Sequence, residues 1–282
     1  MMSDRDRTRL FARYSFIVSI MAAVGALGAA LPEAAADLID AELRPALQTA
    51  FLLYAVLGGL ALLLYRNPPR DVRTAHPDRA PAKLLGRSRR IVLTLAALFS
   101  LDAFAGGLVV QSLLALWVFE RFGLSLATAG AIFFWTGALS AVSYFAAAWI
   151  ADRIGLINTM VCTHLPANLC LALVPFAPSL SFAIALLLVR SALSQMDVPT
   201  RTSYVMAVVA PEERAAAASV TSVPRSLASA ASPALAGAML AISGFGWPLV
   251  LAGALKAAYD LLLLVMFRNV RPPEEAAERP RP

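Results

Sequence analysis

Five ionisable residues of this sequence lie inside stretches that are otherwise apolar: Asp102, Arg190, Arg225, Lys256 and Asp260. A charged side chain that faces lipid costs several kcal/mol, and inside a membrane it usually marks a pathway for a substrate or ion. At a rise of about 1.5 Å per residue, the first four each lie about 15 Å into their stretch, near a bilayer midplane. Asp260 lies one turn beyond Lys256. We predict that the five residues form a substrate and proton pathway.

Further polar residues accompany this set. Arg190, Ser194, Asp197 and Arg201 are spaced by four, three and four residues, which places them on one face of a helix. Asp197 and Arg201 are also placed for an i,i+4 ion pair. A pair that fastens a helix end and a pair that takes part in gating fit this spacing equally well. His164 is able to relay protons, but we favour a packing role in which it bonds to a neighbouring helix.

The composition indicates that these residues sit on membrane-spanning helices. The chain has 282 residues, of which 59% are hydrophobic and 15% charged, and its mean hydropathy is +0.70. Soluble domains carry nearer a quarter charged residues. This excludes a soluble enzyme, a nucleic-acid-binding protein and a disulfide-stapled secreted domain as the main interpretations. We expect an all-α, polytopic membrane protein that contacts lipids.

Eight apolar runs reach the length of about 20 residues that a spanning helix needs. The first has an alternative interpretation as a signal peptide, because four arginines precede it and Ala34-Ala35-Ala36 resembles a cleavage site. We favour a retained anchor, since the run is long for a signal peptide. The eight predicted spans are 14–31, 47–65, 91–118, 127–150, 157–178, 180–208, 215–241 and 246–268.

The basic residues predict the orientation of the chain. Eighteen of the 24 Lys and Arg residues fall in segments on one side of the predicted spans. Basic loops stay on the cytoplasmic side, so both termini are expected in the cytoplasm and the protein in the plasma (inner) membrane. The predicted organisation is two helices over residues 1–65, a basic cytoplasmic linker over 66–90, six helices over 91–268 and a cytoplasmic tail over 269–282.

We expect neither enzymatic activity nor a cofactor or metal site. The two histidines are His76 and His164, and the sequence contains no H-E-x-x-H zinc motif and no G-x-S-x-G nucleophile motif. Cys162 and Cys170 would lie about 12 Å apart on one helix, too far for a disulfide with each other.

One segment resembles a known family. Ala151-Asp152-Arg153-Ile154-Gly155 is similar to the A-D-R-x-G core of the signature loop of major facilitator superfamily transporters, although Ala148 stands where the family has a glycine. An aspartate here is able to cap a helix N-terminus and pair with arginine, which makes a latch between moving helices. The resemblance implies gating roles for Asp152, Arg153 and Gly155, and we add Asp197, Arg201 and Arg214 as latch candidates.

Three other features support the resemblance. Arg190 resembles the mid-helix arginine of the family's helices 4 and 10, Pro211-Glu212-Glu213-Arg214 resembles the P-x-x-R turn that follows, and residues 232–237 resemble its G-P-x-x-x-G stretch. The six spans over 91–268 then correspond to helices 7–12, a complete C-terminal six-helix bundle. The first two spans correspond to helices 5 and 6. The resemblance thus implies a partial major facilitator fold that is N-terminally truncated.

The function implied by this resemblance is secondary transport of a small molecule by alternating access, which we expect to be proton-coupled efflux, with sodium coupling and uniport left open. The predicted midplane charges leave one positive charge over, so either an absent helix supplies an acid or the substrate is anionic. We expect the chain to need a missing N-terminal half as partner for transport. The alternatives are a non-transporting remnant or one part of a split transporter.

Overall fold

The computed structural model describes residues 4–38, 42–66, 85–86 and 88–268, and the regular structure of these residues is entirely helical. Short 3-10 turns at Gly28–Ala30, Val174–Phe176 and Pro211–Glu213 connect some of the helices. The α-helices are α1 (Asp4–Leu27), α2 (Leu31–Leu38), α3 (Leu43–Tyr65), α5 (Arg89–Gly107), α6 (Gln111–Phe122), α7 (Leu126–Ile154), α8 (Leu156–Leu173), α9 (Leu180–Ser194), α10 (Asp197–Val208), α11 (Arg214–Ile242) and α12 (Trp247–Phe267).

Six stretches of the described residues are long and apolar enough to cross a membrane. They match the first five predicted spans and the last one. The apolar helix α9 is shorter than this length, and α11 is long enough but does not reach the required hydropathy. The structure therefore shows a helical protein with several membrane-spanning candidates, and the count of eight spans stays a prediction. The linker residues 67–84 and the tail 269–282 lie outside the described residues.

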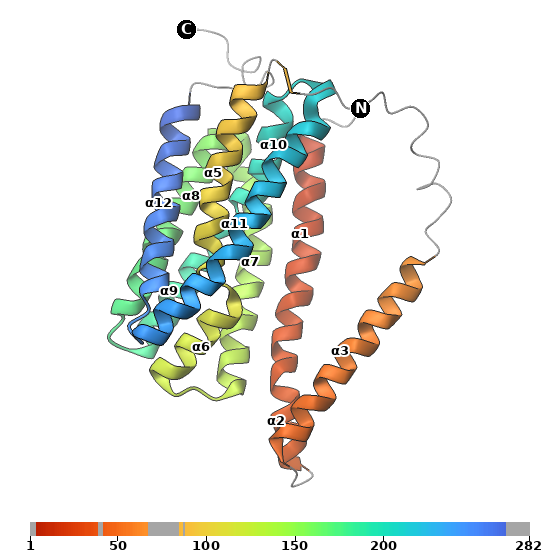
Figure 1. Ribbon diagram of the computed structural model, residues 1–282, viewed down its shortest axis with the longest axis vertical. Coiled ribbons are helices and arrows are strands. Elements are labelled where there is room, and N and C mark those ends of the chain that lie inside the picture. The colour runs from red at the N-terminus through yellow and green to blue at the C-terminus, as the bar shows by residue number, and fades with distance from the viewer. Residues whose placement is uncertain (1–3, 39–41, 67–84, 87, 269–282) are drawn as a thin grey trace.

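Helices α5 to α12 pack into one bundle (Figure 1). The main contacts are those of α11 with α5 and of α12 with α8, and α9 packs on α7 and α8. Helix α1 runs along α7, whereas α3 packs on α2 and leads away from the bundle (Figure 1). The start of α1 and the end of α12 lie at the same end of the molecule, an arrangement compatible with the predicted orientation.

Two apolar clusters form the core of the bundle. One joins α5, α8, α10 and α12 around Leu95, Tyr204 and Tyr259. The other joins α5, α6, α8 and α12 with further helices around Trp117 and Leu249. Asp102 on α5 and Lys256 on α12 fall between these two clusters along their helices. The bundle therefore has a polar layer enclosed by apolar packing on both sides.

Two predicted spans are interrupted in the structure. The third ends as α5 at Gly107 and resumes as α6 at Gln111. The sixth breaks at Gln195, where α9 gives way to α10. Pro199 has no N–H to donate to the Gln195 carbonyl, which accepts instead from Val198 three residues on, at 3.4 Å. The chain is wound more tightly at this break, where the N–H groups of Met196 and Val198 both bond three residues back.

Small residues allow the closest helix contacts in the bundle. A Cβ atom added to Gly107 would lie 2.6 Å from the Ser229 carbonyl oxygen and would collide with the Ser232 hydroxyl. A Cβ atom on Gly253 would lie 2.7 Å from the Asn168 carbonyl oxygen. Helices in membranes associate through such close backbone approach, so α5 packs directly on α11, and α12 on α8.

We predict that Gly107→Ala destabilises the chain by about 1–3 kcal/mol, because the backbone of α11 has to move to admit the methyl group. The free energy of unfolding in mixed micelles measures this effect. Gly237→Ala is the matched control, since Gly237 is also helical and nothing lies within 4 Å of an added Cβ atom. Equal stability of the two variants would contradict the proposed contact.

Candidate functional site

A cavity of about 460 Å³ lies among α5, α8, α9, α10, α11 and α12. Its walls are mainly polar and include carboxylates, cations and hydroxyl groups. The cavity lies between the two apolar clusters, where the sequence places its midplane charges. The charged and titratable residues among its described lining are Asp102, His164, Asp197, Arg201, Arg225 and Lys256.

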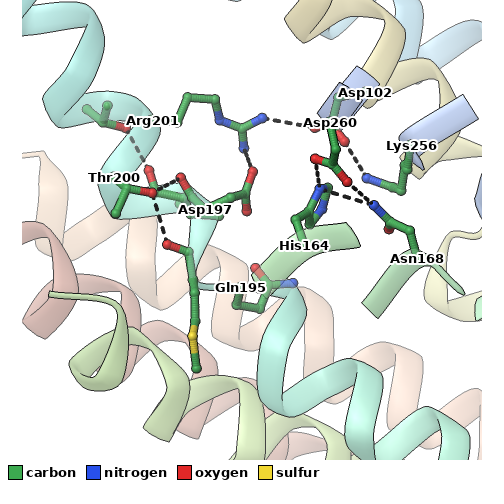
Figure 2. Close-up of polar contacts among 12 residues, drawn as sticks. Asp102, His164, Asn168, Gln195, Asp197, Thr200, Arg201, Lys256 and Asp260 are labelled. Atoms are coloured by element: carbon green, nitrogen blue, oxygen red, sulfur yellow. Dashed lines mark hydrogen bonds and ion pairs between the residues drawn. The ribbon is translucent and has the colours of Figure 1, made fainter. Parts of the chain in front are cut away.

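Asp102 is the central carboxylate of this cavity (Figure 2). Its Oδ1 accepts a hydrogen bond from Lys256 Nζ at 2.5 Å, and its Oδ2 accepts from Arg201 at 2.9 Å. Its side chain and those of its two partners are buried. A buried carboxylate that is bonded to two cations is stabilised in its charged form. Asp102 therefore ties α5 to both α10 and α12.

Arg201 bridges two carboxylates. Besides Asp102 it contacts Asp197, with 3.3 Å between its Nη2 atom and Asp197 Oδ2. The i,i+4 pair expected from the sequence thus exists, but its arginine also reaches across to α5. Figure 2 shows the guanidinium between the two aspartates. An arginine offers several donors in a rigid fork, which suits this bridging position.

Arg225 gives the cavity an unbalanced charge. Its side chain is exposed at the cavity, and it makes no ion pair with any residue that the structure describes. Arg201 and Lys256 are balanced by Asp102 and Asp197, so Arg225 remains as one surplus positive charge. The residues beside it on the wall include Ser226 and Ser229.

Asp260 belongs to a separate buried network next to the cavity. Its Oδ1 lies 2.9 Å from His164 Nδ1, and its Oδ2 accepts a hydrogen bond from Asn168 at 2.8 Å. His164 and Asn168 come from α8, so this network ties α8 to α12 (Figure 2). His164 lines the cavity, while Asp260 is fully buried behind it. Lys256, one turn away on the same helix, turns instead to Asp102.

Arg190 is not among the residues that line this cavity. It lies on α9, and its buried Nε atom has no hydrogen-bond partner among the described residues. The depth of Arg190 in the sequence suggested a place beside Asp102. Ser194, one turn further along the same helix, does line the cavity, so Arg190 lies one turn outside the described lining.

Apart from Asp197 and Arg201 in the cavity, the latch candidates lie in two places. Arg153 stacks its guanidinium over the ring of Trp149 on its own helix, 3.8 Å from the ring centroid. Gly155 ends α7 with a φ of 87°, which favours glycine, and so permits the sharp turn into α8. Asp152 lies in the last turn of α7. Arg214 begins α11, and its buried Nε has no hydrogen-bond partner among the described residues.

Glu213 makes a contact that the sequence analysis missed. Its carboxylate accepts hydrogen bonds from the backbone N–H groups of Gly86 and Ser88, at 3.0 and 3.1 Å. These groups lie just before α5, so a negative charge from the α10–α11 turn sits at the helix N-terminus. The acidic pair in Pro211-Glu212-Glu213-Arg214 is visible in the sequence, but the neighbouring sequence does not identify the distant backbone groups that Glu213 binds.

A helical chain with several apolar spans around a charged internal cavity has the architecture of a membrane transporter. Residues 1–196 match the family model described as Major Facilitator Superfamily, and the chain belongs to that family. Membrane transport by a major facilitator is therefore its function class. A search of curated proteins found no match. The division of the chain at 65, 90 and 268 and the roles of the site residues stay predictions.

We predict that Asp102→Asn destabilises the chain by about 3–5 kcal/mol, because two buried cations lose their shared carboxylate. Asp102→Asn combined with Lys256→Met is expected to recover part of this loss, since Arg201 keeps Asp197. Unfolding free energies in mixed micelles measure the coupling, with Asp37→Asn on an exposed site as control. Additive losses in the double variant would rule out the interaction.

Glu213→Gln is predicted to cost about 1.5–3 kcal/mol, because the hydrogen bonds to the N-terminus of α5 lose their charged acceptor. The neighbouring, exposed Glu212→Gln is the matched control and is expected to leave stability unchanged. Thermal unfolding and hydrogen exchange at the Ser88 and Val92 amides measure the effect. Unchanged exchange in Glu213→Gln would show that the cap does not hold this helix end.

Proposed function

We propose that this chain, alone or with a partner chain, forms a secondary transporter that works by alternating access and whose cavity binds a small organic anion beside Arg225. The observation that supports this proposal is the charge of the described cavity lining, which holds three cations and two carboxylates. Two of the cations are bonded to Asp102, Asp197 or both. The third, Arg225, is left for a ligand.

The chemistry around Arg225 fits a carboxylate or a similar anion. A guanidinium binds such a group through two parallel hydrogen bonds, and nearby hydroxyls are able to donate further ones. Ser226 and Ser229 lie on the same wall of the cavity. The cations bonded to Asp102 already have acceptors, which leaves Arg225 as the cation of the described lining that is available to a ligand.

The packing supports an additional proposal about architecture. We propose that residues 91–268 form the C-terminal six-helix half of a major facilitator. In support, α5 to α12 pack on one another, and their polar residues converge on one cavity. The expectation of proton-coupled export stays a prediction, and flux measured in both directions across vesicle membranes tests it.

Arg225→Gln is predicted to weaken binding of small carboxylates about tenfold or more, because a hydrogen bond to a charged group contributes about 1.5–3 kcal/mol. Calorimetry on the purified chain, with matched pairs of carboxylates and their uncharged amides, measures this loss. Arg225→Lys is expected to lose less, since it keeps the charge but not the fork.

Arg121→Gln is the control, because Arg121 is an exposed arginine on α6, away from the cavity lining. It should bind carboxylates as the unaltered chain does. Two results would contradict the proposal: equal losses for carboxylates and amides in Arg225→Gln, and failure of the unaltered chain to prefer any carboxylate over its amide.

A further inference from the structure

We infer that the buried pair of His164 and Asp260 is the proton-binding site of this transporter, and that its proton and the anion bind together. This inference rests on the proposed function. It assigns the proton to a site on α8 and α12, separate from the place of the anion on α11. Asp260 is fully buried, and His164 stands between it and the cavity.

The geometry requires a proton between the two side chains. His164 Nδ1 lies 2.9 Å from Asp260 Oδ1, and an imidazole lone pair cannot face a carboxylate lone pair at that distance without one. In the state with fewer protons, Nδ1–H donates to a charged carboxylate and the pair carries one negative charge. The second oxygen of Asp260 stays bonded to Asn168 in this state.

The same pair has room for one more proton. The Nε2 atom of His164 makes no hydrogen bond with a described residue, and the ring borders the cavity. A proton taken from cavity water onto Nε2 makes the pair neutral, either as imidazolium with carboxylate or, after the Nδ1 proton moves, as imidazole with carboxylic acid. Burial favours the neutral pair, because an isolated charge is costly in an apolar interior.

Asp102 is a poorer proton acceptor than this pair. It is bonded to two cations, Lys256 and Arg201, and protonation would leave both with a weaker partner. Asp260 has instead a histidine and a neutral amide as its partners. The two carboxylates of α5 and α12 thus have different tasks: Asp102 holds cations and Asp260 shares a proton.

Other groups around the pair act on its charge. From α12 come Lys256, one turn away, and Tyr259, whose ring stands 6.1 Å from that of His164. Asp102 of α5 interacts electrostatically with both members of the pair. Arg201 of α10 neutralises part of the Asp102 charge. Arg190 of α9 does not share the cavity.

Charge balance links the proton to the anion. The described cavity lining has one surplus positive charge at Arg225, and the deprotonated pair beside it has one negative charge, so the lining and the pair together are balanced. When the pair takes up a proton and becomes neutral, it no longer balances the positive charge of Arg225. Binding of a monoanion then restores neutrality. Each ligand therefore strengthens the binding of the other. The two then cross the membrane in the same direction, so this inference replaces the expected proton-coupled export by proton–anion symport.

The test is the affinity of the purified full chain for a small carboxylate between about pH 5 and pH 8, the range in which histidines titrate. The unaltered chain is expected to bind more tightly as the pH falls, by up to about tenfold per pH unit where one proton is linked. The double variant His164→Gln with Asp260→Asn keeps hydrogen-bonding amides and loses both titrating groups. It is expected to bind the anion with no such pH dependence.

The two proposals fail in different ways. Arg225→Gln is expected to lose anion affinity but to keep the titration of the pair, whereas the double variant keeps anion affinity and loses its pH dependence. A pH dependence that persists in the double variant places the proton elsewhere and overturns this inference alone. Weaker binding at lower pH in the unaltered chain overturns it as well. Loss of the preference for anions overturns the proposed function.

A second measurement does not depend on whether the double variant folds. In a His76→Gln chain, His164 is the remaining histidine, and its ring nitrogens are observable by nitrogen NMR. We expect Nε2 to gain a proton as the pH falls, and to gain it at a higher pH when carboxylate is present. An Nε2 that stays protonated throughout, or a titration that carboxylate does not move, would overturn the inference.

Discussion

The structure depends on one buried carboxylate that serves two cations. Asp102 lies between Arg201 and Lys256, and the three residues come from α5, α10 and α12. Moving any one of these charges out of water is costly, so each helix is held in place by the partners of its charge. The cluster sits between two apolar clusters and lines the cavity. Its charges pair with one another, which leaves Arg225 as the surplus charge of the described lining.

The same arrangement gives the cavity two kinds of charged residue. Asp102, Arg201 and Lys256 satisfy one another and have little left for a ligand. By contrast, Arg225 on α11 has no ion-pair partner among the described residues, and His164 on α8 shares a proton with Asp260. A transporter has to bind and release its ligands, which these residues permit better than a fully bonded cluster. Gly107 brings α5 into close contact with α11, the helix that carries Arg225.

Sequence reasoning predicted the class of fold and part of this site. Apolar run lengths indicated a helical membrane protein, and depth counted along each run brought Asp102, Arg225 and Lys256 to one cavity. The same counting did not distinguish Arg190, which lies one turn outside the described lining, from Ser194 on the same helix, which belongs to it. Pairings between distant helices were beyond prediction. Nothing in the sequence connects Asp260 to His164, or Glu213 to Gly86, because these contacts depend on how helices cross.

The central claim is that the charge of the cavity is balanced by one proton and one anion together. The most direct measurement is the number of protons that the full chain takes up when a small carboxylate binds, obtained by calorimetry in buffers of different ionisation enthalpy. This account predicts uptake of a fraction of a proton near the midpoint of the pair's titration. The fraction rises toward one as the pH increases. Zero uptake across the range, or release of protons on binding, would contradict it.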